Sequence, residues 1–162
     1  MEKTKKFLYQ LLKTNLIGQL DSCPYVLANL ANASAVLNEA LDNINWVGFY
    51  LMEGEELVLG PFQGKPACTK IQKGKGVCGT AAERDEVIRV EDVHQFPGHI
   101  ACDSASQSEI VLPLHDQSGN ICAVLDIDSP VKCRFTEEDQ EGLESLTPVL
   151  EQIFLKEEGR SI

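Results

Sequence analysis

Apolar and polar residues alternate along this chain in two different rhythms. Segments with apolar side chains at helical spacing flank a β-prone central region, and turn residues at 53–55 and 116–120 join four of its runs into two hairpins. The expected helices cover residues 3–20, 22–42 and 137–157. The expected strands cover residues 45–52, 56–60, 87–90, 108–114 and 121–128. This order predicts an α+β fold, with a central, mainly antiparallel sheet and helices packed on one of its faces.

The expected helices carry start signals and one apolar face each. Ser22 and Pro24 are expected to open the second helix, and the FTEED sequence at 135–139 is a capping signature for the last. In the first helix, a single apolar stripe with lysines opposite predicts the buried face. That stripe consists of Phe7, Leu8, Leu11, Leu12 and Leu16.

The alternation within the strands predicts a sheet with two unlike faces. One face is aliphatic and suits the helices: Val47, Phe49, Leu51, Ile110, Leu112, Leu114, Ile121, Ala123, Leu125 and Ile127. The opposite face carries the aromatic and acidic residues Trp46, Tyr50, Glu109, Asp126 and Asp128, together with Cys122. An aromatic wall with several carboxylates fits a small ligand that has a cationic amine and a polarisable apolar group. The alternative is a solvated acidic edge with structural aromatics.

A loop-rich insertion at residues 68–102 is expected to cover the acidic face and form a pocket. It holds three of the six cysteines and two of the three histidines. Glycines at 74–79 predict a tight turn that places Cys78 at the start of a short helix. The helix dipole, Lys73 and Lys75 then predict a lowered pKa for the Cys78 thiol. The FPGH sequence at 96–99 predicts a turn just before Cys102.

Composition excludes several classes of partner. The formal net charge of −11 over 162 residues argues against nucleic acids and anionic membranes, since both bind cationic patches. No apolar run reaches transmembrane length. We expect one domain over residues 1–162, in the cytosol, where thiols stay reduced and clustered cysteines indicate catalysis, redox sensing or metal binding.

Three kinds of chemistry fit the residues of the insertion. Metal binding by Cys68, Cys78, His94, His99 and Cys102 is disfavoured because their spacings match no paired ligand pattern, so no metal and no cofactor is expected. A hydrolytic nucleophile, Cys102 with His99 or His94 as base, lacks an oxyanion signature. Redox chemistry fits better, because a thiolate oxidised to sulfenic acid can be resolved to a disulfide by a second cysteine.

Several motifs between residues 45 and 129 strongly resemble the free methionine-(R)-sulfoxide reductases, a GAF-domain family. They are WVGFY at 46–50, GPFQG at 60–64, PAC at 66–68, GKGVCG at 74–79, FPGHIACD at 96–103, SEIV at 108–111 and LDIDS at 125–129. The resemblance implies a GAF fold and the reduction of free L-methionine-(R)-sulfoxide by a cytosolic homodimer that thioredoxin recycles. The competing class is a GAF sensor module that binds a small ligand without catalysis. A chain that ends with its last helix has no output domain, which counts against that class.

The resemblance also assigns residues. It implies that Cys102 is the catalytic cysteine, Cys68 the main resolving cysteine and Cys78 a third participant. It matches Trp46, Tyr50, Glu109, Asp126 and Asp128 to the substrate pocket. Crowding of the carboxylates favours Glu109 as the general acid, while Asp126 and Asp128 suit the substrate ammonium. The outlying thiols of Cys23, Cys122 and Cys133 are expected to be dispensable.

Overall fold

The computed structural model describes residues 2–100 and 104–155. In chain order the elements are α1 (Glu2–Leu20), α2 (Val26–Ala40), β1 (Trp46–Glu53), β2 (Glu56–Gln63), β3 (Lys70–Gln72), α3 (Gly76–Arg84), β4 (Ile88–Val90), η1 (Val93–Gln95), β5 (Ser108–His115), β6 (Ile121–Ser129) and α4 (Glu137–Leu155). Within these residues, no helix is both long and apolar enough to cross a membrane.

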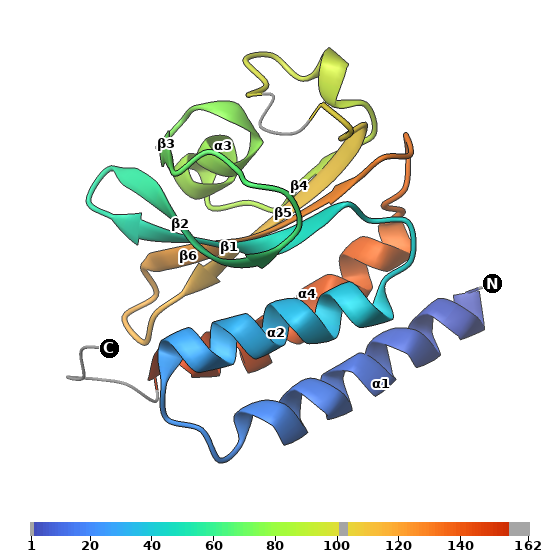
Figure 1. Cartoon of the computed structure of the whole chain (residues 1–162), viewed down its shortest axis with the longest axis vertical. Coiled ribbons are helices and arrows are strands. Elements are labelled where there is room, and N and C mark those ends of the chain that lie inside the picture. The colour runs from blue at the N-terminus through green and yellow to red at the C-terminus, as the bar shows by residue number, and fades with distance from the viewer. Residues whose placement is uncertain (1, 101–103, 156–162) are drawn as a thin grey trace.

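The described strands form one six-stranded sheet in the order β3-β2-β1-β6-β5-β4, and its neighbouring strands pair antiparallel. Helices α1, α2 and α4 cover one face, while α3 and the segments around it cover the other (Figure 1). The predicted α+β architecture is therefore confirmed. The short strand β3 was not expected, because three residues are too few to show alternation.

The face toward α1, α2 and α4 carries the larger cluster of buried residues, here called the helix-side core. Alternate residues of the central strands supply its sheet half, including Phe49, Leu112 and Leu125, none of which has measurable exposure. Leu16 of α1 and Leu146 of α4 supply part of the helical half. The predicted aliphatic face is thus confirmed for β1 and β5.

Helix α1 buries only part of the stripe that its sequence predicts, because Leu12 and Leu16 lie in the core and Leu8 packs against it. Phe7 and Leu11 are 65% and 50% exposed, while Tyr9, Leu12 and Leu16 are buried. Two apolar stripes therefore run along this helix on different sides, and periodicity alone does not reveal which one meets the core. The exposed stripe, formed by Phe7, Leu11 and Ile17, is here called the outward stripe of α1.

The start of α2 also differs from the prediction. The helix begins at Val26, and its N-cap residue, Tyr25, makes no capping hydrogen bond with its side chain. Instead Asn29 Nδ2 donates to the carbonyl oxygen of Cys23 at 2.9 Å, so a side chain from the first turn satisfies the backbone of the preceding loop. Leu27, in the first turn of α2, is 49% exposed.

The start of α4 agrees with the predicted capping signature. Thr136 donates to Asp139 through its backbone N–H at 3.0 Å and its hydroxyl at 3.1 Å. Asp139 also accepts from Tyr9 Oη at 2.8 Å, from Lys5 Nζ at 2.9 Å and from Arg134 Nη1 at 3.2 Å. Burial alone would raise the pKa of Asp139, but these hydrogen bonds and charges hold it below its usual value. Asp139 therefore joins α4 to α1.

The opposite face of the sheet carries the second cluster, here called the pocket-side cluster. Trp46 and Tyr50 of β1 lie in it, as the alternation predicts, together with Val111 of β5 and Cys78 of α3. Cys122 departs from the prediction, because it packs against the helix-side core. His115 pairs with Ile121 whereas Leu114 pairs with Ala123, so Cys122 lies in a local register shift that alternation does not anticipate.

Candidate active site

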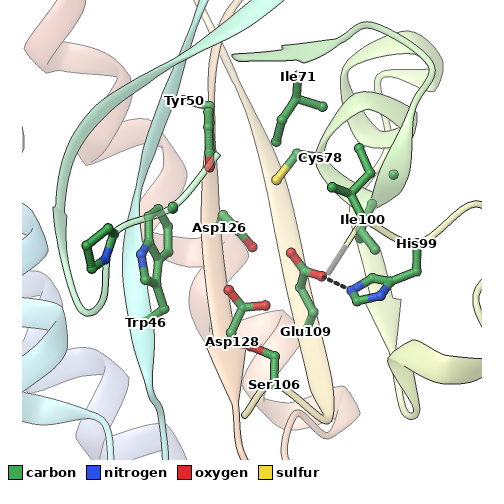
Figure 2. A pocket seen from close by; sticks show the side chains of 14 residues that line it. Trp46, Tyr50, Ile71, Cys78, His99, Ile100, Ser106, Glu109, Asp126 and Asp128 are labelled. Carbon is green, nitrogen blue, oxygen red and sulfur yellow. Dashed lines mark ion pairs between the residues drawn. The ribbon is translucent and has the colours of Figure 1, made fainter. Parts of the chain in front are cut away.

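A pocket lies between the pocket-side face of the sheet and α3 (Figure 2). Its cavity measures about 40 Å³. The residues that line it include Trp46, Tyr50, Pro66, Ala67, Ile71, Gly76, Val77, Cys78, His99, Ile100, Ser106, Glu109, Asp126 and Asp128. The structure thus brings together the five pocket residues that the sequence predicts, and their roles remain to be tested.

Aromatic side chains form one wall of the pocket. The Trp46 ring stacks between Tyr50, with centroids 5.9 Å apart, and Phe62, with centroids 5.0 Å apart. Trp46 Nε1 donates to the carbonyl oxygen of Lys65 at 3.1 Å, and Tyr50 Oη donates to that of Cys68 at 2.9 Å. Because backbone carbonyls satisfy both polar groups, the two rings are fixed and offer largely apolar surface to a ligand.

Three carboxylates lie at the floor of the pocket on adjacent strands. Glu109 of β5 pairs with Asp128 of β6, and Asp126 is two residues before Asp128 on the same face. Glu109 and Asp126 are only 5% and 6% exposed. Burial, and then the charges of Asp126 and Asp128, raise the pKa of Glu109 well above its usual value. Burial also raises the pKa of Asp126, so this pair retains a proton that a reaction could use.

The thiol of Cys78 points into this acidic group from the third residue of α3. Burial, followed by the charges of Asp126 and Glu109, raises the pKa of the Cys78 thiol well above its usual value. The prediction of a lowered pKa is therefore wrong. The lysine neighbours in sequence do not offset the carboxylates on the facing strands, and Lys75 is solvent-exposed. Loss of hydration outweighs the helix dipole at a fully buried thiol.

The remaining predicted cysteines differ in what the structure describes. Cys68 is disulfide-bonded and packs against the pocket-side cluster. Cys102 lies outside the described residues, so the predicted bond between these two cysteines stays a prediction. Among the described residues, the free cysteines are Cys23, Cys78, Cys122 and Cys133.

His99 and Ser106 line the pocket although neither was assigned to a substrate site. His99 Nε2 lies 3.9 Å from Glu109 Oε1 (Figure 2), and burial followed by the charge of His94 lowers the pKa of His99. Ser106 Oγ accepts from Asn45 Nδ2 at 3.1 Å. The FPGHIACD motif contained a signal for His99, whereas Ser106 precedes its strand and lies outside the alternation that revealed the other residues.

Comparison with known proteins places this chain in a family. The GAF domain matches residues 32–154. The chain is 61% identical to the free methionine-R-sulfoxide reductase of Escherichia coli (strain K12) over 127 residues, which cover 78% of this chain and 76% of that protein. The chain belongs to the free methionine-R-sulfoxide reductases, a GAF-domain family. The family expected from the motifs is therefore confirmed.

Solved structures from this family have the same fold. The reduced form of the Staphylococcus aureus fRMsr superposes with a TM-score of 0.86 at 51% identity, over 90% of this chain and 94% of that one. The free methionine-R-sulfoxide reductase of Neisseria meningitidis, in complex with its substrate, superposes with a TM-score of 0.91 at 43% identity, over 95% of this chain and 92% of that one.

Proposed function

We propose that this protein reduces free L-methionine-(R)-sulfoxide to methionine. The observation that carries the proposal is the buried Glu109 and Asp126 pair, placed between a rigid aromatic wall and the Cys78 thiol. A redox pocket of this composition, in a chain of this family, supports sulfoxide reduction over passive ligand binding. No metal or cofactor is required for the two steps below.

The first step is a two-electron reduction of the sulfoxide by a cysteine. The thiolate of Cys102 attacks the sulfoxide, the oxygen passes to the cysteine, and the products are methionine and a sulfenic acid. The oxygen needs a proton as its bond to the substrate sulfur breaks. Glu109 is the proposed donor, because burial and crowding keep its carboxyl protonated.

The second step regenerates the enzyme. The Cys68 thiol condenses with the sulfenic acid, a disulfide forms, and water leaves. The oxidised state of Cys68 supports this role. A dithiol reductant such as thioredoxin then reduces the disulfide and is itself oxidised. Cys78 is a proposed third participant, although its raised pKa makes it a slow nucleophile until a neighbouring carboxyl accepts its proton.

The walls of the pocket suit a free amino acid. Trp46 and Tyr50 are placed to contact the methyl and sulfur end, and Asp126 and Asp128 to bind the ammonium. A peptide has no free ammonium at an internal methionine, so it cannot make the contact proposed for Asp126 and Asp128. We therefore expect selectivity for free methionine sulfoxide over protein-bound methionine sulfoxide.

A homodimer in the cytosol is the proposed working form, with residues 1–162 as one GAF domain. The outward stripe of α1 and its neighbour α2 support the dimer, because Phe7, Leu11, Ile17, Tyr25 and Leu27 are all about half exposed or more. Large apolar side chains gathered on one helical layer are typical of surfaces that a partner covers. The competing hypothesis is a sensor module that binds the same ligand without turnover.

A steady-state assay with thioredoxin and its reductase tests the function. The free R isomer should be reduced, and a peptide methionine sulfoxide should not. Cys102→Ser should abolish turnover, Cys68→Ser should stop after about one equivalent of substrate because the sulfenic acid is unresolved, and the control Cys133→Ser should match the wild type. Absence of turnover with the free R isomer, or equal turnover of the peptide, contradicts the proposal.

A further inference from the structure

We propose that Cys78, Glu109 and Asp126 form a binding site for Zn²⁺, and that an ion held there closes the pocket. One ligand atom from each of these three side chains lies within 4.8 Å of the other two. The site uses a thiol and two carboxylates from three separate elements: α3, β5 and β6. Its position is that of the proposed reaction, but its ligand is different.

The three side chains are held in place by packing. Cys78, Glu109 and Asp126 are 4%, 5% and 6% exposed, and they point toward one another in the pocket (Figure 2). Donors that already converge need little rearrangement to bind an ion, which lowers the entropic cost of binding.

An unsatisfied oxygen in the pocket points to a cation. Asp126 Oδ1 is buried and has no hydrogen-bond partner, although its side chain faces the cavity. A buried carboxylate oxygen without a partner lowers the stability of the fold. A cation bound to this oxygen would remove that cost and would also neutralise the crowded charges of Glu109 and Asp126.

The size of the cavity favours an ion when Cys68 is oxidised. The volume of about 40 Å³ is enough for about one or two water-sized particles. A single ion is of that size.

The donor set selects the class of ion. Thiolate and carboxylate ligands together suit Zn²⁺, with bonds of about 2.3 Å to sulfur and about 2.0–2.2 Å to oxygen. Three protein ligands leave a fourth position toward the cavity for water. Mg²⁺ and Ca²⁺ prefer six or more oxygens and disfavour sulfur. On binding, the Cys78 thiol and the carboxyl pair of Glu109 and Asp126 give their protons to solvent. One sulfur–zinc bond and two oxygen–zinc bonds form, without any change in oxidation state.

The consequence for the enzyme is reversible inhibition. The ion would occupy the place proposed for the substrate ammonium and would keep Cys78 from disulfide exchange. This inhibition rests on the proposed function, whereas the binding itself does not.

Cadmium titration of the oxidised protein tests the site, because Cys68 is then unavailable and Cys78 is free. Cd²⁺ should bind as one equivalent, give the ultraviolet charge-transfer band of a cadmium–thiolate bond, and compete with Zn²⁺. Cys78→Ser should remove the band and weaken Zn²⁺ binding by about 100-fold or more. Loss of a residue that only hydrogen-bonds to a metal ligand typically has a smaller effect. Asp126→Asn, which keeps the thiol, should weaken Zn²⁺ binding by at least about tenfold. Cys133→Ser, at an exposed cysteine outside the pocket, is the matched control and should bind normally.

Two results would overturn the site. One is a band that persists in Cys78→Ser, which would place the metal at another thiol. The other is Zn²⁺ affinity that is equal in the wild type and in both folded variants. Metal binding in a protein without reductase activity would refute the proposed function and leave the site intact. Reductase activity that is insensitive to Zn²⁺, with no metal bound, would refute the metal site and leave the proposed function intact.

Discussion

The two faces of the sheet are equally buried but differ in what they bury. On the helix side, Ile110, Leu112 and Leu125 meet other apolar side chains with no exposed surface. On the pocket side, Glu109 and Asp126 occupy alternate positions of the same strands and are nearly as inaccessible. Adjacent residues along one strand therefore have opposite effects on the stability of the fold. One face contributes stability through apolar burial, whereas the other keeps polar groups dry at a cost in stability.

This arrangement makes strand register decisive for function as well as for folding. Because side chains alternate with a period of two, a slip of one residue in β5 would place Ile110 in the pocket and Glu109 in the helix-side core. The aliphatic face thus positions the acidic face. Burial therefore raises the free energy of unfolding on the aliphatic face and lowers it on the acidic face. Four substitutions test this contrast.

The largest effect on stability is expected at Asp139, the buried carboxylate at the start of α4. Unlike Asp126, it has hydrogen-bond donors for both oxygens. Asp139→Ala should destabilise the fold by about 3–5 kcal/mol, because Lys5, Arg134 and Tyr9 lose their shared partner. Urea unfolding at neutral pH measures this loss of stability.

The stabilisation by Asp139 should depend on pH. Since the pKa of Asp139 is lowered in the fold, this stabilisation is present above the unfolded pKa and is lost as pH falls through the folded value. A loss under about 1 kcal/mol would show that the network is dispensable.

Glu109→Gln should have the largest effect on the chemistry. Removal of the proposed acid should lower the maximal rate by about 100-fold and change the Michaelis constant little. Asp128→Asn, on the neighbouring strand, should mainly raise the Michaelis constant because it weakens ammonium binding. The opposite pattern would exchange the two roles. Unchanged kinetics in both variants would favour the solvated acidic edge.

The same Glu109→Gln variant should be more stable than the wild type at neutral pH, by about 1 kcal/mol. The pKa of Glu109 is raised in the fold, so the wild type loses stability as pH rises from the unfolded pKa toward the folded one. The variant should lack that decline. Thermal unfolding between pH 4 and 8 measures both curves, and parallel curves would show that the carboxyl is not strained by burial.

The smallest effect is expected at His115, which connects the two sides of the sheet. His115 Nε2 lies 2.6 Å from Asp85 Oδ1 at the end of α3, and Nδ1 lies 2.8 Å from Glu151 Oε2 on α4. Burial lowers the pKa of His115, but these hydrogen bonds and charges raise it above its usual value. His115→Gln should cost less than about 1 kcal/mol, because the pair is partly exposed. The cost should be full below the unfolded pKa and vanish as pH rises through the folded one. Melting temperatures that differ equally at all pH values would exclude this role.

The sequence pattern predicted the features that depend only on alternation within a strand. It did not predict the features that depend on contacts with distant parts of the chain. The faces of Trp46, Tyr50, Glu109, Asp126 and Asp128 follow from a period of two, which β1, β5 and β6 obey. The pKa shift of Cys78 could not be predicted from its neighbours in sequence, which are lysines. In the fold, carboxylates on the facing strands surround its thiol. In α1, two apolar stripes were merged into one. The choice between them depends on the packing of α4, and notably on the close approach of Tyr9 to Gly142, where an added Cβ would lie 2.1 Å from the ring.

The cavity is narrow in the structure in which Cys68 is oxidised. A volume of about 40 Å³ holds about one or two waters. In the proposed reaction we therefore expect methionine to depart before the disulfide is complete, so that the reductant meets an enzyme that holds no product. For a reductase of this kind, initial rates at varied sulfoxide and reductant concentrations should give parallel double-reciprocal lines, the signature of ping-pong turnover.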